Sequence, residues 1–544
     1  MKVFFKHYYL LNNQIWMNKI WSVLSILFLI EIQSIEATDT IKPPFIKSTT
    51  GVCQLMVQAK PWVMLAGELH NSSSSDLAYM ETIWNKLNEL YLNTVIASVS
   101  WELFEPEEGK FDFSLVDGII KGAREHDLKL VLIWFGTWKN GWSTYVPEWV
   151  KTELKRFPRM QAKPGENSGA LSAFSENTLQ ADAKAFAALM KHIREVDAAE
   201  QTVIMLQVEN ETGVLHTSRD KSPLAEAMFQ QPIPAQLSTY LQKQRGNLRP
   251  EMKALLSATG RTTGSWSDVF GFSADEAFQA WYVASFVGKV VEKGKKEYNI
   301  PMYVNAWLDP NFAESIKTEY PSGGPVSKVI DIWKAAAPSI DLYAPDIYLE
   351  DFKRVCNQYA QQGNPLFIPE AHRDARAAAN VYYALGEHNA IGFSPFGIDA
   401  LNADHPLSSV YKSLTGFLPF WAKNQGILKS RGFIYTNSSE EKIELGDFVF
   451  TIHYTQKRDL SSDIPEAAGL ILQLNPNEFI FTGFGYHVRM APSSGKGWVE
   501  IIKNDEGEFV NGIWKSGRRM NGDEMEISFS SKPEFRWIKI QTIK

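Results

Sequence analysis

The stretch VIMLQVENETG, residues 203–213, decides the fold of this chain. Its first six residues form a mostly apolar run that is typical of a buried strand, and the polarity then changes abruptly to Glu209-Asn210-Glu211. Charged groups at the edge of a core lower stability unless a ligand or a reaction uses them. The pattern predicts a strand whose end presents Glu211 as a catalytic acid, with Glu209 in a supporting structural role.

A second stretch repeats this arrangement. In PLFIPEAHRD, residues 365–374, a short apolar run again ends in an acid, Glu370. The two acids lie far apart in the chain, so only the fold can bring them together. A barrel of parallel strands would do so, because the carboxyl ends of all its strands face one cavity.

Strand-like apolar runs alternate with helical patterns through most of the chain, as in a parallel sheet covered by helices. Strands are expected at residues 63–69, 94–99, 129–135, 203–208, 302–306, 340–344, 366–369 and 390–394. Helices are expected at residues 75–90, 115–126, 178–197 and 275–298, where apolar residues recur every three or four positions. The order predicts a (β/α)8 TIM barrel, with a doubly wound sheet as the alternative. Loops at 136–177 and 214–275 are expected to wall the substrate cleft.

Past residue 421 the pattern changes to short alternating strands, expected at 448–454, 469–474, 478–481, 498–503, 525–529 and 535–542. This pattern predicts an all-β sandwich, which is either a structural appendage or a carbohydrate-binding domain. The expected domains are a signal peptide at 1–37, a catalytic barrel at 38–425 and the C-terminal β-sandwich at 426–544.

The N-terminus resembles a targeting segment. Lys19 precedes an apolar run of 11 residues at 20–30, which suits a signal-peptide core and is too short for the roughly 20 residues that cross a bilayer. We expect cleavage near Ala37 and export to the periplasm, the cell surface or the medium, without a stable membrane span. Met17 is an alternative start to Met1.

Bulk composition excludes several classes of protein. The net charge of −7 argues against nucleic acid as a partner. Only two cysteines occur, Cys53 and Cys356, without the CxxC spacing of a metal site, and either a bridge or two free thiols is compatible with the sequence. The oligomeric state is left open.

Carboxylates, amides and aromatic rings gather at the expected strand ends. Beside the catalytic pair Glu211 and Glu370, the expected substrate-binding residues are Asn210, Glu68, His70, Trp101, Glu102, Glu105, Trp307 and Tyr348. Trp134, Trp138 and Trp142 also follow a strand, where sugar faces could stack. Because no phosphate-binding loop, GxSxG turn or metal-ligand spacing occurs, neither a metal nor an organic cofactor is expected. Paired acids with stacking rings are typical of glycoside hydrolysis, and a retaining enzyme holds the acids about 5 Å apart.

Two motifs carry a resemblance to a known family. LQVENETG at 206–213 is similar to the QVENEYG of family 35 β-galactosidases, and SWELFEPEEGKFDF at 100–113 is similar to their WNxHEPxxGxFDF. This family is part of the clan of retaining barrel glycosidases. The resemblance implies Glu211 as acid/base, Asn210 as partner of the sugar 2-hydroxyl, Glu370 as nucleophile and the GELH at 67–70 as part of the sugar site. It also implies that Tyr348 donates to the nucleophile.

The sequence thus predicts an exported, retaining exo-β-galactosidase that acts on oligosaccharides or plant polysaccharide side chains. The nearest alternative is another retaining β-glycosidase of the clan, such as a β-glucosidase or a family 42-type galactosidase. A catalytically inactive, glycan-binding barrel is a different class, and it would bind sugar without turnover. The β-rich C-terminus is similar to the extra domain of a bacterial subgroup of family 35.

Overall fold

The structure, a computed structural model, describes residues 42–49, 51–310, 319–455 and 467–544. The expected targeting segment at 20–30 and its cleavage position near Ala37 lie outside these residues. Among the described helices, none has both the length and the apolar character needed to cross a membrane. Cys53 and Cys356 are both free thiols, so of the two possibilities left by the sequence the structure has no bridge.

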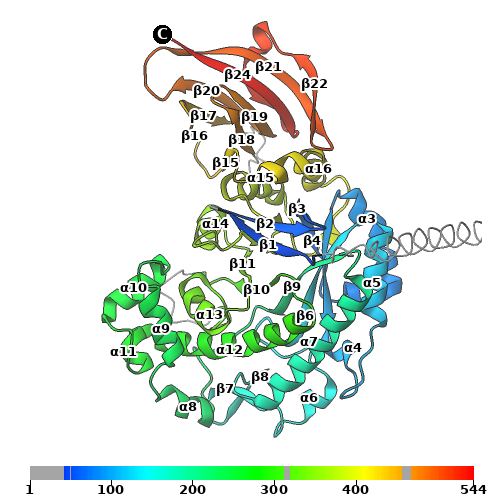
Figure 1. Ribbon diagram of the computed structural model, residues 1–544, viewed down its shortest axis with the longest axis vertical. Coiled ribbons are helices and arrows are strands. Elements are labelled where there is room, and N and C mark those ends of the chain that lie inside the picture. The colour runs from blue at the N-terminus through cyan, green and yellow to red at the C-terminus, as the bar shows by residue number, and fades with distance from the viewer. Residues whose placement is uncertain (1–41, 50, 311–318, 456–466) are drawn as a thin grey trace, which may run out of the picture. The chain divides into compact units, whose positions relative to one another are not determined.

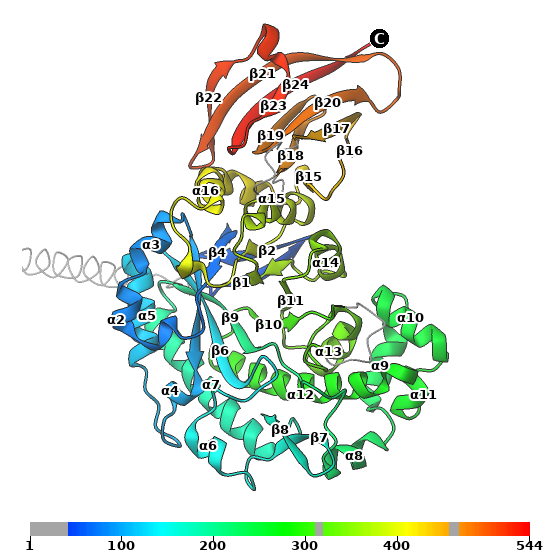
Figure 2. The same cartoon turned by 180° about the vertical axis from the view of Figure 1, so that it is seen from behind.

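Parallel strands form the barrel at the centre of Figures 1 and 2. In chain order they are β4 (Met64–Glu68), β5 (Thr94–Ser100), β6 (Lys129–Lys139), β9 (Val203–Asn210), β10 (Met302–Trp307), β11 (Leu342–Ile347), β12 (Phe367–Ile368), β13 (Glu370–Ala371) and β14 (Gly392–Phe393). Pro369, which lacks an N–H, divides the seventh strand into β12 and β13. Since β12 pairs with β14 and β13 pairs with β11, the sheet closes on itself. The predicted TIM barrel is confirmed, and the doubly wound alternative is excluded.

The strands alternate between two apolar environments, as period-two side-chain geometry requires. Ile96, Val131 and Ile133 point into the barrel and belong to its interior cluster. Their neighbours along the same strands, such as Val95 and Leu132, face the helices. Leu55 and Val57 complete the interior cluster. They come from a small antiparallel sheet that the sequence analysis did not predict, formed by β1 (Phe45–Thr49), β2 (Val52–Val57) and β3 (Lys60–Trp62).

Helices cover the outside of the barrel. The main ones are α5 (Ser114–Glu125), α7 (Glu176–Asp197), α12 (Ala274–Glu297), α13 (Ile330–Ala336), α14 (Phe352–Tyr359), α15 (Arg376–His388) and α16 (Pro406–Asn424). Shorter turns are α4 (Trp101–Phe104), η3 (Ser327–Val329) and η4 (Ile398–Ala400). The helices expected at 115–126, 178–197 and 275–298 are therefore confirmed to within a few residues at each end.

Three expectations are wrong in detail. The single helix expected at 75–90 is divided into η1 (Ser73–Ser75), α2 (Leu77–Glu81) and α3 (Trp84–Glu89), because the Thr82 hydroxyl donates to the Tyr79 carbonyl and closes α2. The loop expected at 136–177 contains α6 (Glu148–Thr152) and the hairpin of β7 (Arg159–Lys163) and β8 (Glu166–Leu171). The loop expected at 214–275 contains α8 (Pro223–Phe229), α9 (Ala235–Lys243), α10 (Pro250–Thr259), α11 (Trp266–Phe270) and η2 (Gly271–Ser273). Prolines that the sequence analysis treated as loop residues are the first residues of α8 and α10.

The C-terminal region is all β, as predicted. A six-stranded antiparallel sheet contains β15 (Lys429–Ile434), β18 (Ala468–Asn475), β19 (Glu478–Phe484), β21 (Trp498–Val510), β22 (Ile513–Arg519) and β24 (Glu534–Ile543). A four-stranded sheet contains β16 (Glu440–Leu445), β17 (Phe448–Tyr454), β20 (Tyr486–Pro492) and β23 (Ile527–Phe529), and η5 (Gly522–Met525) precedes β23. Alternate residues of β17 enter an apolar cluster that both sheets share.

Candidate active site

Strand β9 delivers Glu209, Asn210 and Glu211 to the carboxyl end of the barrel, where all three are buried. Glu209 and Glu211 have φ values of 63° and 43°, in the left-handed region that residues other than glycine rarely adopt. Such strain persists only where the surrounding structure imposes it, and it is concentrated at functional sites. The left-handed turn therefore marks this strand end as a candidate active site.

The two predicted catalytic acids meet here. Carboxyl oxygens of Glu211, Glu370 and Asp346 all lie within 4.8 Å of one another. The Asn140 amide donates to Glu211 Oε2 at 2.5 Å, and the Glu211 N–H donates to Asn305 Oδ1 at 2.9 Å. Burial, followed by the negative charge of Glu370, raises the pKa of Glu211 to about 7. Glu211 can therefore hold a proton near neutral pH and give it up in a reaction.

Glu370 has a different environment, because hydrogen-bond donors surround it. The Tyr348 hydroxyl donates to Oε2 at 2.8 Å, and the amides of Asn210 and Asn305 donate to Oε1 at 3.2 and 3.4 Å. An ionised carboxylate, which only accepts hydrogen bonds, suits this set of donors. The predicted contact between Tyr348 and the proposed nucleophile is present in the structure.

Lys139 and Asn140 are site residues that the sequence analysis missed. Lys139 is buried, and its Nζ donates to Asn210 Oδ1 at 3.0 Å. The third strand was expected to end at residue 135, but β6 continues to Lys139. Polar residues at the true strand end were therefore assigned to a loop. Their position after a long apolar run, in WKNG at 138–141, is the signal that could have identified them.

Behind the catalytic pair, a buried carboxyl pair holds this extension of β6 in place. Asp182 accepts hydrogen bonds from Trp134 Nε1 at 2.8 Å and from the Thr137 N–H at 3.1 Å, and Glu209 Oε2 accepts one from the Trp138 N–H at 2.6 Å. Burial and the adjacent charge of Asp182 raise the pKa of Glu209 well above its usual range, so the two acids share a proton. Glu209 thus has the structural position that the sequence analysis expected.

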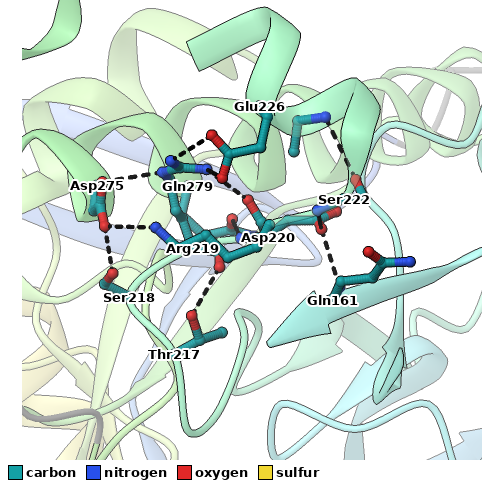
Figure 3. A network of polar contacts seen from close by, with 11 residues as sticks. Gln161, Thr217, Ser218, Arg219, Asp220, Ser222, Glu226, Asp275 and Gln279 are labelled. Carbon is teal, nitrogen blue, oxygen red and sulfur yellow. Dashed lines mark hydrogen bonds and ion pairs between the residues drawn. The ribbon is translucent and has the colours of Figure 1, made fainter. Parts of the chain in front are cut away.

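The chain beyond Glu211 is anchored by the polar network in Figure 3. The buried Arg219 pairs with Asp275 at 3.0 Å and with Glu226 at 2.9 Å. Asp220 accepts hydrogen bonds from the backbone N–H groups of Gln161 and Ser222 at 3.0 and 2.8 Å. The network ties the segment after β9 to α8, α12 and β7, so the turn that carries Glu211 is held from both sides.

Two further acids complete the centre. Glu68, at the end of β4, is buried, and neither of its carboxyl oxygens has a hydrogen-bond partner among the described residues. Burial and the charge of Glu370 raise the pKa of Glu68 and of Asp346 well above the usual range. Asn305 Nδ2 donates to Asp346 Oδ2 at 2.8 Å. The raised pKa favours the protonated form of each acid, and a protonated Glu68 can donate to a ligand hydroxyl.

The cluster of Glu211, Asp346 and Glu370 is also the group of described residues whose geometry could hold a metal ion. Amide N–H groups of Asn210 and Asn305 already point at the oxygens of Glu370 and Asp346. Donors in these positions suit a cluster of acids that shares protons, and they compete with a cation.

Four predicted sugar contacts are corrected. Trp101 is fully buried and its Nε1 donates to Glu105 Oε2 at 2.8 Å, while Glu105 is itself buried and also accepts from the Gly109 N–H. This pair fixes the loop after β5 and presents no surface to a sugar. Trp134 and Trp138 are also fully buried in the core, so neither ring can stack on a sugar.

The remaining predicted residues lie at the barrel mouth. The Trp307 ring is 38% exposed at the end of β10 and can stack on a sugar. His70 is partly exposed, and its Nδ1 lies 2.9 Å from Asp399. Glu102 pairs with Lys151 at 2.7 Å on the rim and also lines a pocket with Tyr145. His70 and Glu102 are therefore each held by a charged neighbour, Asp399 and Lys151.

Comparisons with family models agree with this geometry at the level of enzyme class. Residues 71–259 match a glycoside hydrolase family 42 model described as "Beta-galactosidase". Residues 407–530 match the model of a different family, described as "Domain of unknown function (DUF5597)". The first match spans roughly a third of the chain and includes Glu211. It supports a hydrolase that acts on glycosides. Family 35 is not confirmed, and the match fits the family 42-type alternative. No curated protein matches the chain.

Solved structures resemble the chain only distantly. A β-galactosidase from Bacillus circulans sp. alkalophilus has 15% identity and a TM-score of 0.45, and the match covers 65% of this chain and 56% of that one. A β-galactosidase from Rahnella sp. R3 has 16% identity and a TM-score of 0.43, with 68% and 57% covered. A β-mannanase from the blue mussel Mytilus edulis has 11% identity and a TM-score of 0.39, with 68% and 96% covered. The chain thus spans little more than half the length of these two β-galactosidases, and at such scores the likenesses carry no functional argument.

Proposed function

We propose that the protein is an exported, retaining exo-β-galactosidase that removes terminal β-galactosyl residues from oligosaccharides or plant polysaccharide side chains, without a metal or organic cofactor. One observation carries the proposal: carboxyl oxygens of Glu211 and Glu370 lie within 4.8 Å of each other at the barrel mouth. Retaining glycosidases place their two acids about 5 Å apart, whereas inverting enzymes leave room for a water between them.

The geometry assigns a role to each acid. Glu370, which accepts hydrogen bonds from Tyr348 and two amides, attacks the anomeric carbon, and Glu211 protonates the departing oxygen. The C–O bond to the leaving group breaks as the bond to Glu370 forms. Water then attacks the glycosyl ester, and Glu211 accepts its proton.

The change of role at Glu211 follows from charge. The negative charge of Glu370 is one of the causes that raise the pKa of Glu211 to about 7. When Glu370 becomes an ester, this charge disappears and the pKa of Glu211 falls. Glu211 is therefore an acid while Glu370 is free and becomes a base once Glu370 is glycosylated.

Galactose is the proposed sugar because the two sequence motifs and the family model point to β-galactosidases. A panel of nitrophenyl β-glycosides tests this choice, since a β-glucosidase of the same clan would prefer the glucoside. Exo action predicts that galactose is the only sugar released from an oligosaccharide.

The decisive experiment follows the anomeric proton of the first product by NMR during hydrolysis of nitrophenyl β-galactoside. We expect the β-anomer first, and a loss of kcat on the order of a thousand-fold in Glu370→Gln. Glu211→Gln should lose the basic limb of the pH profile. Glu350→Gln serves as the control, because Glu350 is an exposed carboxylate in the segment after β11 and lies outside the cluster of Glu211, Asp346 and Glu370. An α-anomer as first product, or an unchanged pH profile in Glu211→Gln, would contradict the assignment.

Export is proposed from the sequence at 20–30 alone. Expression of the full chain followed by cell fractionation and N-terminal sequencing tests it. Mature protein that begins near residue 38 outside the cytoplasm is the expected result, and intact protein in the cytoplasm would contradict it.

A further inference from the structure

A pocket of about 530 Å³ lies between the barrel and the C-terminal sheets. The segment after β11, together with His372 and α15, forms one wall, and the end of β15 with Tyr435, Thr436 and Asn437 forms the other. In Figure 2, α14, α15 and β15 can be followed around this region. Its volume falls within the range of roughly 300–1,000 Å³ that small-ligand sites occupy.

The two walls are fixed to each other. Lys353 on α14 pairs with Glu441 on β16 at 2.9 Å, and Arg431 on β15 pairs with Glu387 on α15 at 2.9 Å. Gly432 packs so closely on α15 that an added Cβ would lie 2.7 Å from the Glu387 backbone nitrogen. The pocket therefore has a defined shape that belongs to the fold.

Two residues, His372 and Tyr348, connect the pocket wall to the proposed nucleophile. His372, in the pocket wall, donates from Nε2 to the Tyr348 carbonyl at 3.1 Å, and the rings of His372 and Tyr348 meet edge to face at 5.1 Å. The Tyr348 hydroxyl in turn donates to Glu370. The pocket wall is thus connected, through His372 and Tyr348, to the carboxyl group proposed as the nucleophile.

The lining carries the acids Glu350 and Asp351 as well as the cations Lys353 and Arg376, and this balance of charge favours a neutral ligand. Two of its cations are already paired, Lys353 with Glu441 and Arg376 with Asp374 at 2.6 Å. The side-chain amides of Asn380 and Asn437 have no hydrogen-bond partner among the described residues. Amides with free donors and acceptors beside the Tyr435 ring match the hydroxyls and apolar face of a neutral sugar.

We propose that this pocket binds the sugar residues on the leaving-group side of the scissile bond, so that the C-terminal sheets form part of the substrate-binding site. The choice of a glycan rests on the proposed function. An exo-acting enzyme holds only the terminal sugar at its catalytic pair, so every further residue of the substrate lies on this side. The proposal gives the C-terminal region a direct role in substrate selection.

The test compares two substrates in the full-length protein. Nitrophenyl β-galactoside reaches only the catalytic centre, whereas a β-galactosyl-terminated trisaccharide also reaches the pocket. Asn380→Ala and Asn437→Gly, singly and together, remove the amides from opposite walls, and glycine keeps the positive φ of 65° at residue 437. We expect the double variant to lower kcat/KM for the trisaccharide, relative to the aryl galactoside, by about 10-fold, through KM.

Asn511→Gly is the matched control, because Asn511 is also exposed with a positive φ, in the turn between β21 and β22. It should leave the ratio of the two kcat/KM values unchanged. An unchanged ratio in the double variant would overturn the proposal, as would an equal loss on both substrates.

A failure of the proposed function gives a separate result. If wild-type protein hydrolyses neither substrate, calorimetric titration with the same trisaccharide tests the pocket alone. Binding that weakens in the double variant but not in Asn511→Gly supports the pocket, and binding that is absent or equal in all three proteins rejects it.

Discussion

Lys139→Met removes one positive charge from the centre of the site while keeping much of the side chain that packs near Phe135. Lys139 Nζ donates to Asn210 Oδ1 at 3.0 Å, and Asn210 Nδ2 donates to Glu370 Oε1 at 3.2 Å. The substitution leaves a buried amide oxygen without its charged donor. Loss of such a bond is worth about 1.5–3 kcal/mol, which corresponds to a fall of about 10- to 150-fold in kcat/KM.

The same substitution should also move the pH profile. The positive charge of Lys139 is one of the influences that lower the pKa of Glu211 from the value that burial and Glu370 alone would give. An opposite charge within about 4–6 Å shifts a carboxyl pKa by about 1–3 units. Without Lys139 the pKa of Glu211 rises above about 7, so the basic limb should move to higher pH by about 1 unit.

The assay is kcat/KM for an aryl β-galactoside against pH, for Lys139→Met, Lys139→Arg and Lys151→Met. Lys139→Arg keeps the charge and should shift the limb less. Lys151 pairs with Glu102 on the rim, where solvent screens its charge, so Lys151→Met should behave as wild type. A basic limb that stays in place or moves to lower pH in Lys139→Met would refute the reasoning.

Three further predictions follow from single contacts. Tyr348→Phe removes the hydrogen bond of 2.8 Å to Glu370. In steady-state kinetics it should lower kcat about 10- to 100-fold with a smaller change in KM, and an unchanged kcat would contradict a role for this hydrogen bond in the reaction. Because the folded pKa of Glu209 is raised, this residue stabilises the folded state below its unfolded pKa of about 4.3, and that stabilisation is lost as pH rises through the folded pKa. Glu209→Gln does not titrate, so its stability should not show this pH-dependent loss. The melting temperature of Glu209→Gln minus that of wild type should therefore increase from about pH 5 to about pH 8. Gly432→Ala forces β15 away from α15 and should destabilise the protein by about 1–3 kcal/mol in denaturant unfolding, whereas Gly246→Ala, with nothing within 4 Å, should not.

The barrel could be predicted from the sequence because its strands are continuous apolar runs. Parallel strands covered by helices are apolar on both faces, and runs such as 129–135 and 203–208 stand out against the polar turns. Glu211 and Glu370 were found for the same reason, since each follows such a run directly. The distance between the two acids depends on how the barrel closes. Closure occurs where β12 pairs with β14 and β13 pairs with β11, on either side of Pro369, and a local sequence pattern does not predict these pairings.

The sequence failed where burial depends on distant partners. Trp101 and Trp307 both follow a strand, yet one is fully buried against Glu105 and the other is 38% exposed. Local composition is similar at the two positions, so only the packed structure distinguishes a core ring from one that can stack on a sugar. Lys139 was missed because β6 continues beyond its apolar run into a segment held by Asp182 and Glu209.

The charges of the centre support the proposed roles of Glu370 and Glu211. Four carboxyl groups, on Glu68, Glu211, Asp346 and Glu370, lie in a buried site where Lys139 supplies a positive charge. Four buried negative charges beside one positive charge would be strongly unfavourable, so some of the acids must remain protonated. Glu370 is the acid that accepts hydrogen bonds from three side chains, those of Tyr348, Asn210 and Asn305. Burial, followed by the charge of Glu370, raises the pKa values of Glu68 and Asp346 well above their usual range and that of Glu211 to about 7. The proposed division of labour therefore rests on the three hydrogen-bond donors that surround one acid of the four.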